Sequence, residues 1–181
     1  MDGFLESFVT AGEDGAALAN STSPTSLLPA SRKITLPTYF FDRVGKRLRV
    51  KAAGRISTLA TTPGTLTLDV KLGSIIVFSS GAMTLNTSAK TNVGWLYEAD
   101  LICRAIGSGT TANLLGQGLF TSEAVIAALR PTHVLPFNAA PAVGSGFDST
   151  AAQALDFVAT WSVANASNSI TLHQFHVESP T

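Results

Sequence analysis

The chain has 181 residues, of which 45% are hydrophobic and 13% are charged, and its twelve basic and twelve acidic side chains cancel. A chain of this length is typical of one domain with a substantial core. Because it contains no basic tract and no apolar run of the ~20 residues that cross a membrane, we expect neither nucleic-acid binding nor a membrane helix.

The N-terminal part, residues 1–31, is small, polar and interrupted by proline. We expect it to be an extended arm that precedes a β-sandwich domain at residues 32–181. The arm carries Phe4, Leu5, Phe8 and Val9, whose side chains need a surface to bury them. We expect these residues to contact a neighbouring subunit or a partner protein. A first strand on the domain's own edge is the alternative.

Short alternations of apolar and polar residues follow along most of the chain, which indicates strands with one buried and one wetter face. Residues 34–41 contain Pro37 and predict an edge strand or a loop. Further strands are predicted at 48–56, 66–72, 75–78, 94–106, 113–121, 154–163 and 169–178. The run at 75–78 is continuously apolar, as in a strand covered on both faces.

The region between the fifth and sixth of these further strands is less regular. Residues 123–129 have helical composition that ends before Pro131, and residues 131–146 are rich in proline and glycine and predict a long loop. One helical turn is expected at 149–153. About eight strands at this spacing predict a two-sheet antiparallel β-sandwich of jelly-roll type. An immunoglobulin-like sandwich is the alternative, although it is normally shorter.

The alternation also predicts which side chains form the core. Leu155, Phe157, Ala159, Trp161 and Val163 share one face of a strand, and Cys103 is in phase with Trp95, Tyr97 and Leu101. We therefore expect the single cysteine to be a buried hydrophobe rather than a nucleophile.

No group of residues has the spacing of a catalytic or metal site, so we expect no enzymatic activity and no cofactor. His173 and His176 are three apart, which on a regular strand places them on opposite faces and argues against a zinc site. Glu98 and Asp100 share a face, but Arg104 lies on the same face and is expected to neutralise one of them.

The remaining charge is concentrated in one strand, where Arg47, Arg49 and Lys51 alternate with apolar residues and predict a wet face. Elsewhere the polarity comes from threonine and serine. A neutral, hydroxyl-rich surface is poorly defended against association. We therefore expect a protein that is partly covered by copies of itself or by a partner; a soluble monomer is the alternative.

Three segments carry a family resemblance: NSTSPTSLLPASRKITLP at 20–37, LRVKAAGRISTLATTPGTLTLDVKLG at 48–73 and ALDFVATWSVANASNSITLHQFHVES at 154–179. Together with AIGSGTTANLLGQGLF at 105–120, they resemble small virion structural proteins of tailed bacteriophages. The resemblance covers the chain from about residue 20 onward and contains no catalytic motif.

The resemblance implies a jelly-roll capsid decoration (cement) protein, made in the host bacterial cytoplasm and located on the outside of the virion capsid. It implies two partners, the major capsid protein and sister copies in a homotrimer. The alternative that it leaves open is the receptor-binding head of a tail fibre. The family supplies no binding residues that can be transferred to this chain.

Overall fold

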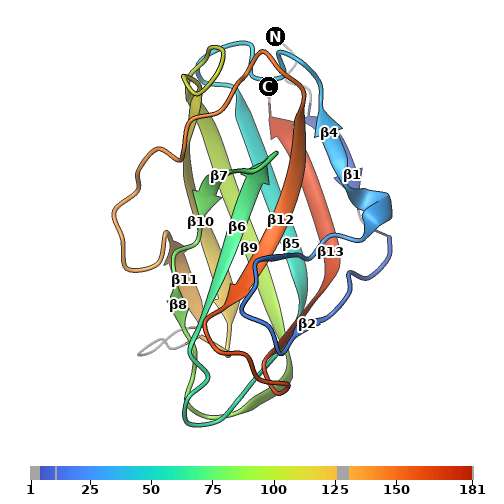
Figure 1. Cartoon of the computed structure of the whole chain (residues 1–181), viewed down its shortest axis with the longest axis vertical. Helices are drawn as coiled ribbons and strands as arrows, with labels where there is room; N and C mark the ends of the chain where they lie inside the picture. Colours follow the sequence, from blue (N-terminus) through green and yellow to red (C-terminus); the bar gives the residue numbers. More distant parts are fainter. Residues whose placement is uncertain (1–4, 11, 126–130, 181) are drawn as a thin grey trace.

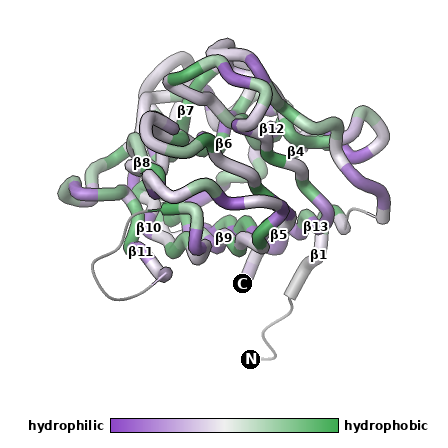
Figure 2. Tube along the Cα trace, turned by 90° about the horizontal axis from the view of Figure 1, so that it is seen from below, coloured by the Kyte–Doolittle hydropathy of each residue, from purple (hydrophilic) through white to green (hydrophobic). Residues whose placement is uncertain are grey.

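The computed structural model describes residues 5–10, 12–125 and 131–180. Within them, two antiparallel sheets pack face to face, as Figures 1 and 2 show. The larger sheet contains, in order, β1 (Leu5–Thr10), β13 (Ser169–Pro180), β5 (Arg47–Thr58), β9 (Lys90–Ala105), β10 (Asn113–Ser122) and β11 (Thr132–Leu135), and the short β2 (Leu18–Ala19) also pairs with β13.

The smaller sheet contains, in order, β3 (Thr25–Ser26), β12 (Gln153–Trp161), β6 (Thr65–Leu72) and β7 (Ile75–Ser79), with β4 (Ile34–Leu36) on β12 and β8 (Met83–Thr84) on β6. The predicted two-sheet antiparallel sandwich is therefore confirmed, and the strand order is compatible with a jelly roll. The predicted strands are all present, most of them with bounds extended by one to four residues.

Three expectations about local structure are wrong. The predicted loop at 131–146 begins with β11, a regular edge strand that pairs with β10. Residues 149–151 form a bend rather than a helical turn, and β12 begins at Gln153. In β7, the side chain of Ile76 is 40% exposed, so this strand is not covered on both faces. Of the segment with helical composition, residues 123–125 form a turn with a bridge to Leu85, and 126–129 lie outside the described residues.

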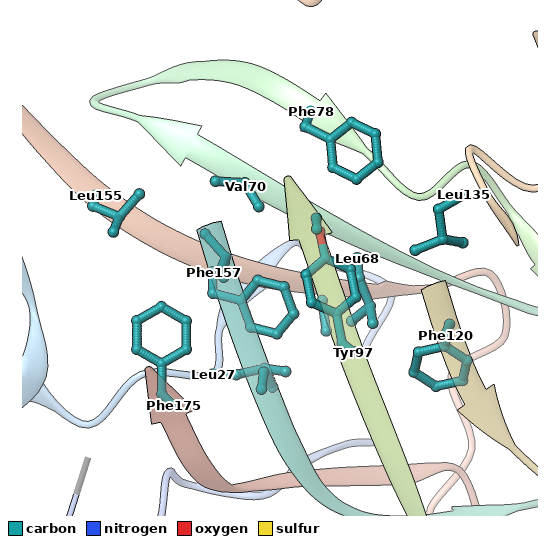
Figure 3. Close-up of a cluster of buried hydrophobic side chains, with 14 of the residues drawn as sticks. Leu27, Leu68, Val70, Phe78, Tyr97, Phe120, Leu135, Leu155, Phe157 and Phe175 are labelled. Carbon is teal, nitrogen blue, oxygen red and sulfur yellow. The ribbon is translucent and has the colours of Figure 1, made fainter. Parts of the chain in front are cut away.

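The core lies between the sheets, where the predicted phases are confirmed except at Val163, which lies beyond the end of β12 and is only partly buried. Phe157 and Trp161 of β12, and Tyr97 and Cys103 of β9, are each at most 2% exposed. Figure 3 shows Tyr97 and Phe157 side by side in this layer, and their ring centroids are 4.9 Å apart. Each such side chain stabilises the fold by about 1.5–3 kcal/mol through burial.

Extended segments close the two open sides of the sandwich. On one side, the arm lies between β13 and β12: the Gly15 N–H donates to the Leu172 carbonyl, 2.9 Å away. A Cβ at Gly15 would lie 2.0 Å from the Leu27 carbonyl oxygen, so a close approach within the arm requires glycine here. On the other side, the Gly144 N–H donates to Leu114 of β10 and the Ser145 N–H donates to Ile76 of β7.

Candidate interaction surface

The outer face of the larger sheet contains two adjoining hollows, which we call the sheet groove, with volumes of about 610 Å³ and 510 Å³. Both hollows are lined by Ala53 of β5, Leu96 of β9, Thr121 of β10 and Gln174 of β13. The pairing register of the strands explains the two hollows, because Ala53 lies opposite Leu96 on one side and Gln174 on the other. A methyl group between two longer side chains leaves a depression across the sheet.

Three exposed apolar side chains, which we call the apolar stripe, lie on the same face, and two of them, Leu96 and Leu119, line the groove. They are Leu96, Leu119 and Val134, and they are 61%, 46% and 66% exposed. They come from the three consecutive strands β9, β10 and β11, and Leu119 lies directly opposite Val134. A single exposed leucine is ordinary, whereas three on neighbouring strands of one face form a patch suited to contact with another molecule.

A charged cluster lies beside the groove on the same face. Arg49 of β5 is its centre: Nε and Nη2 donate to the two carboxylate oxygens of Asp100 at 3.1 and 3.2 Å. Nη1 donates to Oε1 of Glu178 at 3.0 Å. Arg47 adds a second ion pair to Asp100 and Lys51 a second to Glu178. Fork-shaped pairing of this kind fixes side chains and neutralises the charges.

Glu178 is the most buried member of the cluster, with a side chain that is 5% exposed. Burial alone raises the pKa of its carboxyl group, because it penalises the charged form. Hydrogen bonds from Arg49, Lys51 and His176 outweigh that effect and hold the pKa of Glu178 below its usual value. The carboxylates of Asp100 and Glu178 are therefore paired within the cluster, whereas the buried Nε of Arg47 has no hydrogen-bond partner among the described residues.

The wet face predicted for Arg47, Arg49 and Lys51 is confirmed, since all three project from the outer face into this cluster. The expected role of Arg104 is wrong. Asp100 is neutralised by Arg49 and Arg47, because β5 lies next to β9 and brings both guanidinium groups opposite the carboxylates.

The two histidines of β13 also differ from the expectation of opposite faces. The pairing register shifts between Leu172 and Gln174, so a β-bulge adds one residue at His173. As a result, His173 and His176 both border the sheet groove. They remain separate: His173 Nδ1 is 2.7 Å from Asp14, and His176 Nε2 is 3.2 Å from Glu178.

The four residues expected to contact another chain lie in or next to β1. Phe4 is outside the described residues. Leu5 pairs through its backbone with Pro180. Phe8 is partly buried against Phe40, with ring centroids 5.2 Å apart, and Val9 is buried in the core. The described part of this segment thus lies on the edge of its own domain, as in the alternative considered above.

Other side chains that might carry chemistry have structural roles. The Ser149 hydroxyl accepts a hydrogen bond from the Gly107 N–H at 2.9 Å and does not contact a histidine. No group of three or more histidine, cysteine, aspartate or glutamate side chains gathers in metal-binding geometry among the described residues. Within the same residues, no helix is long and apolar enough to span a membrane.

Comparisons of the chain with protein-family models, curated proteins and solved structures find no match.

Sequence reasoning did not identify the sheet groove and the apolar stripe. One signal was present: Leu96 alternates in phase with Glu98 and Asp100, on the polar side of its strand. One apolar residue in a polar phase is ordinary, so this signal alone does not indicate an interaction surface. The sequence does not indicate that Val134 belongs to the apolar stripe, because its proline-rich segment predicts a loop.

Proposed function

We propose that this protein is a structural component of a bacteriophage virion, a decoration protein that binds the major capsid protein as a homotrimer and stabilises the shell. The observation that carries this proposal is the apolar stripe beside the sheet groove, on a sandwich whose surface is otherwise rich in neutral hydroxyl groups. Such a surface suits a protein that works by being bound.

In this proposal, catalysis has no part and the mechanism is mechanical. Each trimer spans a junction between shell subunits and adds buried contact area that the bare junction lacks. A contact of ordinary size, burying about 1,200–2,000 Å², is sufficient. Repetition over the whole shell then multiplies a modest free energy per site.

We assign the contact with the shell and the contact between sister copies to different parts of the larger sheet. We assign shell binding to the edge formed by β1, which contains Leu5 and Phe8, with Val9 anchoring β1 from inside the core. The strands β13 and β5 lie between this edge and β9, where the apolar stripe begins.

The decisive test is the number of copies per particle, measured by quantitative mass spectrometry on purified virions of the phage that encodes the chain. A decoration protein gives a copy number that approaches that of the major capsid protein. A few trimers per particle would instead indicate the head of a tail fibre. Absence of the chain from purified virions would overturn both functions.

A further inference from the structure

We propose that His133 is a pH-sensitive latch for the edge strand β11: the strand stays on the larger sheet while the ring is neutral, and protonation of the ring releases it. This inference goes beyond the function proposed above and does not depend on it. It rests on where the ring lies, on what surrounds it and on how β11 is held.

His133 occupies an inward-facing position of its strand. Buried and exposed residues alternate along β11, with His133 and Leu135 buried and Thr132 and Val134 exposed. The residue is 7% exposed, and its ring meets the ring of Phe137 edge-on, with centroids 5.4 Å apart. Such a position tolerates a neutral side chain, whereas a charged one is costly there.

The surroundings of the ring favour its neutral form. A neutral imidazole carries one N–H group, whereas the imidazolium carries two and needs an acceptor for each. The Nε2 atom is shielded from solvent and has no hydrogen-bond partner among the described residues. The backbone carbonyl of Val125 favours the protonated ring, but burial is the larger effect and lowers the pKa of His133. The ring therefore takes up a proton more readily in water than on the closed strand.

The described neighbours of the ring offer no counter-ion for that proton. Neither β10 nor β11 contains an acidic or a basic residue. In the turn at 123–125, Glu123 is the charged group, and its Oε2 atom is 3.5 Å from Nζ of Lys90. Residues 136–137 and β8 contribute no charge, and Arg130 lies outside the described residues. The influences on the pKa of His133 accordingly include no charged side chain.

β11 is the element that a charged ring would displace, because the strand is held from one side. Within the described part of the chain, it pairs only with β10, over four residue pairs at the end of the larger sheet. Backbone hydrogen bonds from Ser122 to Pro131, at 2.9 Å, and from Phe137 to Ser80, at 2.7 Å, hold its two ends. Short edge elements open at lower free energy than central strands. Local opening therefore relieves the charge without unfolding the core.

The pKa of the ring in the open and closed states sets the pH range of the latch. Exposed to water, the ring has the ordinary histidine value of 6.5, and on the closed strand its pKa is lower. Below pH 6.5 the open state binds a proton that the closed state does not. The equilibrium constant for opening then rises by up to about tenfold for each pH unit, until the closed state is protonated as well.

The labelling rate of an engineered thiol measures this opening. Leu135→Cys places a thiol on the inner side of β11, where the native side chain is fully buried. The natural Cys103 is equally buried but lies in the central strand β9, so it reports opening of the core. A thiol reagent that remains reactive in mild acid is added at pH 7.5 and at pH 5.5. Peptide mass spectrometry separates the two sites, and each rate is divided by that of a free thiol.

We expect the corrected labelling rate at position 135 to rise about fivefold or more from pH 7.5 to pH 5.5, while the rate at Cys103 stays unchanged. Labelling follows the opening equilibrium when reclosing is faster than the reaction. In the same background, His133→Gln keeps a polar side chain that cannot take up a proton, so its rate should not vary with pH. His173→Gln and His176→Gln are the matched controls and should retain the increase.

Three results would overturn the latch. The first is a labelling rate at position 135 that is equal at both pH values, or an increase that survives His133→Gln. The second is an increase of the same size at Cys103, which would show that acid opens the whole core. The third needs no substitution: an NMR titration in which the His133 ring of the parent protein protonates at or above pH 6.5. None of these results bears on the copy number in virions, which tests the proposed function separately.

Discussion

The indole Nε1 of Trp161 donates a hydrogen bond to the carbonyl oxygen of Leu18, 3.4 Å away, and thereby ties the N-terminal arm to the centre of the sandwich. Both side chains are buried. Trp161 belongs to the smaller sheet, whereas Leu18 lies in β2 on the edge of the larger one. One aromatic residue thus joins the arm and both sheets.

Replacing Trp161 should destabilise the fold. Trp161→Ala is expected to lower the free energy of unfolding by about 3–5 kcal/mol, because it leaves a large cavity in the core. Trp161→Phe keeps most of the packing and loses the hydrogen bond, so its cost should be smaller. Urea denaturation measures both. Equal stability of Trp161→Ala and the parent protein would contradict the burial described above.

Removing residues 1–12 tests the role of β1. The truncation deletes Val9, which is buried, and the partly buried Phe8. We expect the free energy of unfolding to fall by about 2–4 kcal/mol, from the apolar area that these side chains bury. The matched point variant Val9→Ala should show a smaller loss. A truncated protein with unchanged melting temperature would contradict the pairing of β1 with β13 described above.

The buried carboxylate of Glu178 predicts a pH dependence. Because the pKa of Glu178 is lower in the folded state than in the unfolded chain, its ionised form stabilises the fold above about pH 4.5, and this contribution disappears as the pH falls through the folded-state value. Glu178→Gln should cost about 1–3 kcal/mol at pH 7. The gap between the two proteins should narrow at pH 3–4. A gap that does not vary with pH would contradict the ionic role.

Asp69 predicts a pH dependence of stability with the opposite sign, because its ionised form destabilises the fold. It is 7% exposed, and its Oδ1 atom has no hydrogen-bond partner among the described residues. Burial raises the pKa of Asp69, although Ser79 and Lys71 oppose the effect, so at pH 7 the ionised group works against folding. Asp69→Asn should stabilise the protein by about 1 kcal/mol at pH 7. This gain should vanish below pH 3.8, the ordinary pKa of an aspartate.

A neighbouring aspartate is the control for that comparison. Asp156 of β12 accepts a hydrogen bond from Ser26 at 2.5 Å and pairs with Lys33 at 3.5 Å. Asp156→Asn should therefore be neutral or destabilising under the same conditions. If both asparagine variants stabilise the protein equally, the cause would be a general loss of negative charge rather than the burial of Asp69.

The fold class and the core were predictable because strict alternation dominates the long strands. Trp161 and Phe157 fall in one phase of β12, and both are buried as that phase requires. Alternation fails where the backbone adds a residue. The bulge at His173 carries no compositional mark in the sequence, so the placement of both histidines beside one groove could not be predicted.

Short edge strands and surfaces built by several strands were harder to predict. The segment containing Val134 lies among prolines, which favoured a loop, and its strand exists because β10 offers it a hydrogen-bonding edge. The sheet groove depends on the register that places Ala53 between Leu96 and Gln174, and no single strand encodes that register. The strand β11 and the sheet groove both depend on pairing between separate strands, which the local sequence does not encode.

The pairing of the first strands with the last has a consequence for biosynthesis. β1 and β2 pair with β13, and β3 and β4 pair with β12, so segments near the N-terminus have their sheet partners near the C-terminus. Contacts between residues so distant along the chain make folding slow. The two sheets cannot be completed while residues 153–180 are still inside the ribosome. Until then, the apolar side chains of the earlier strands are exposed to aggregation or to chaperones.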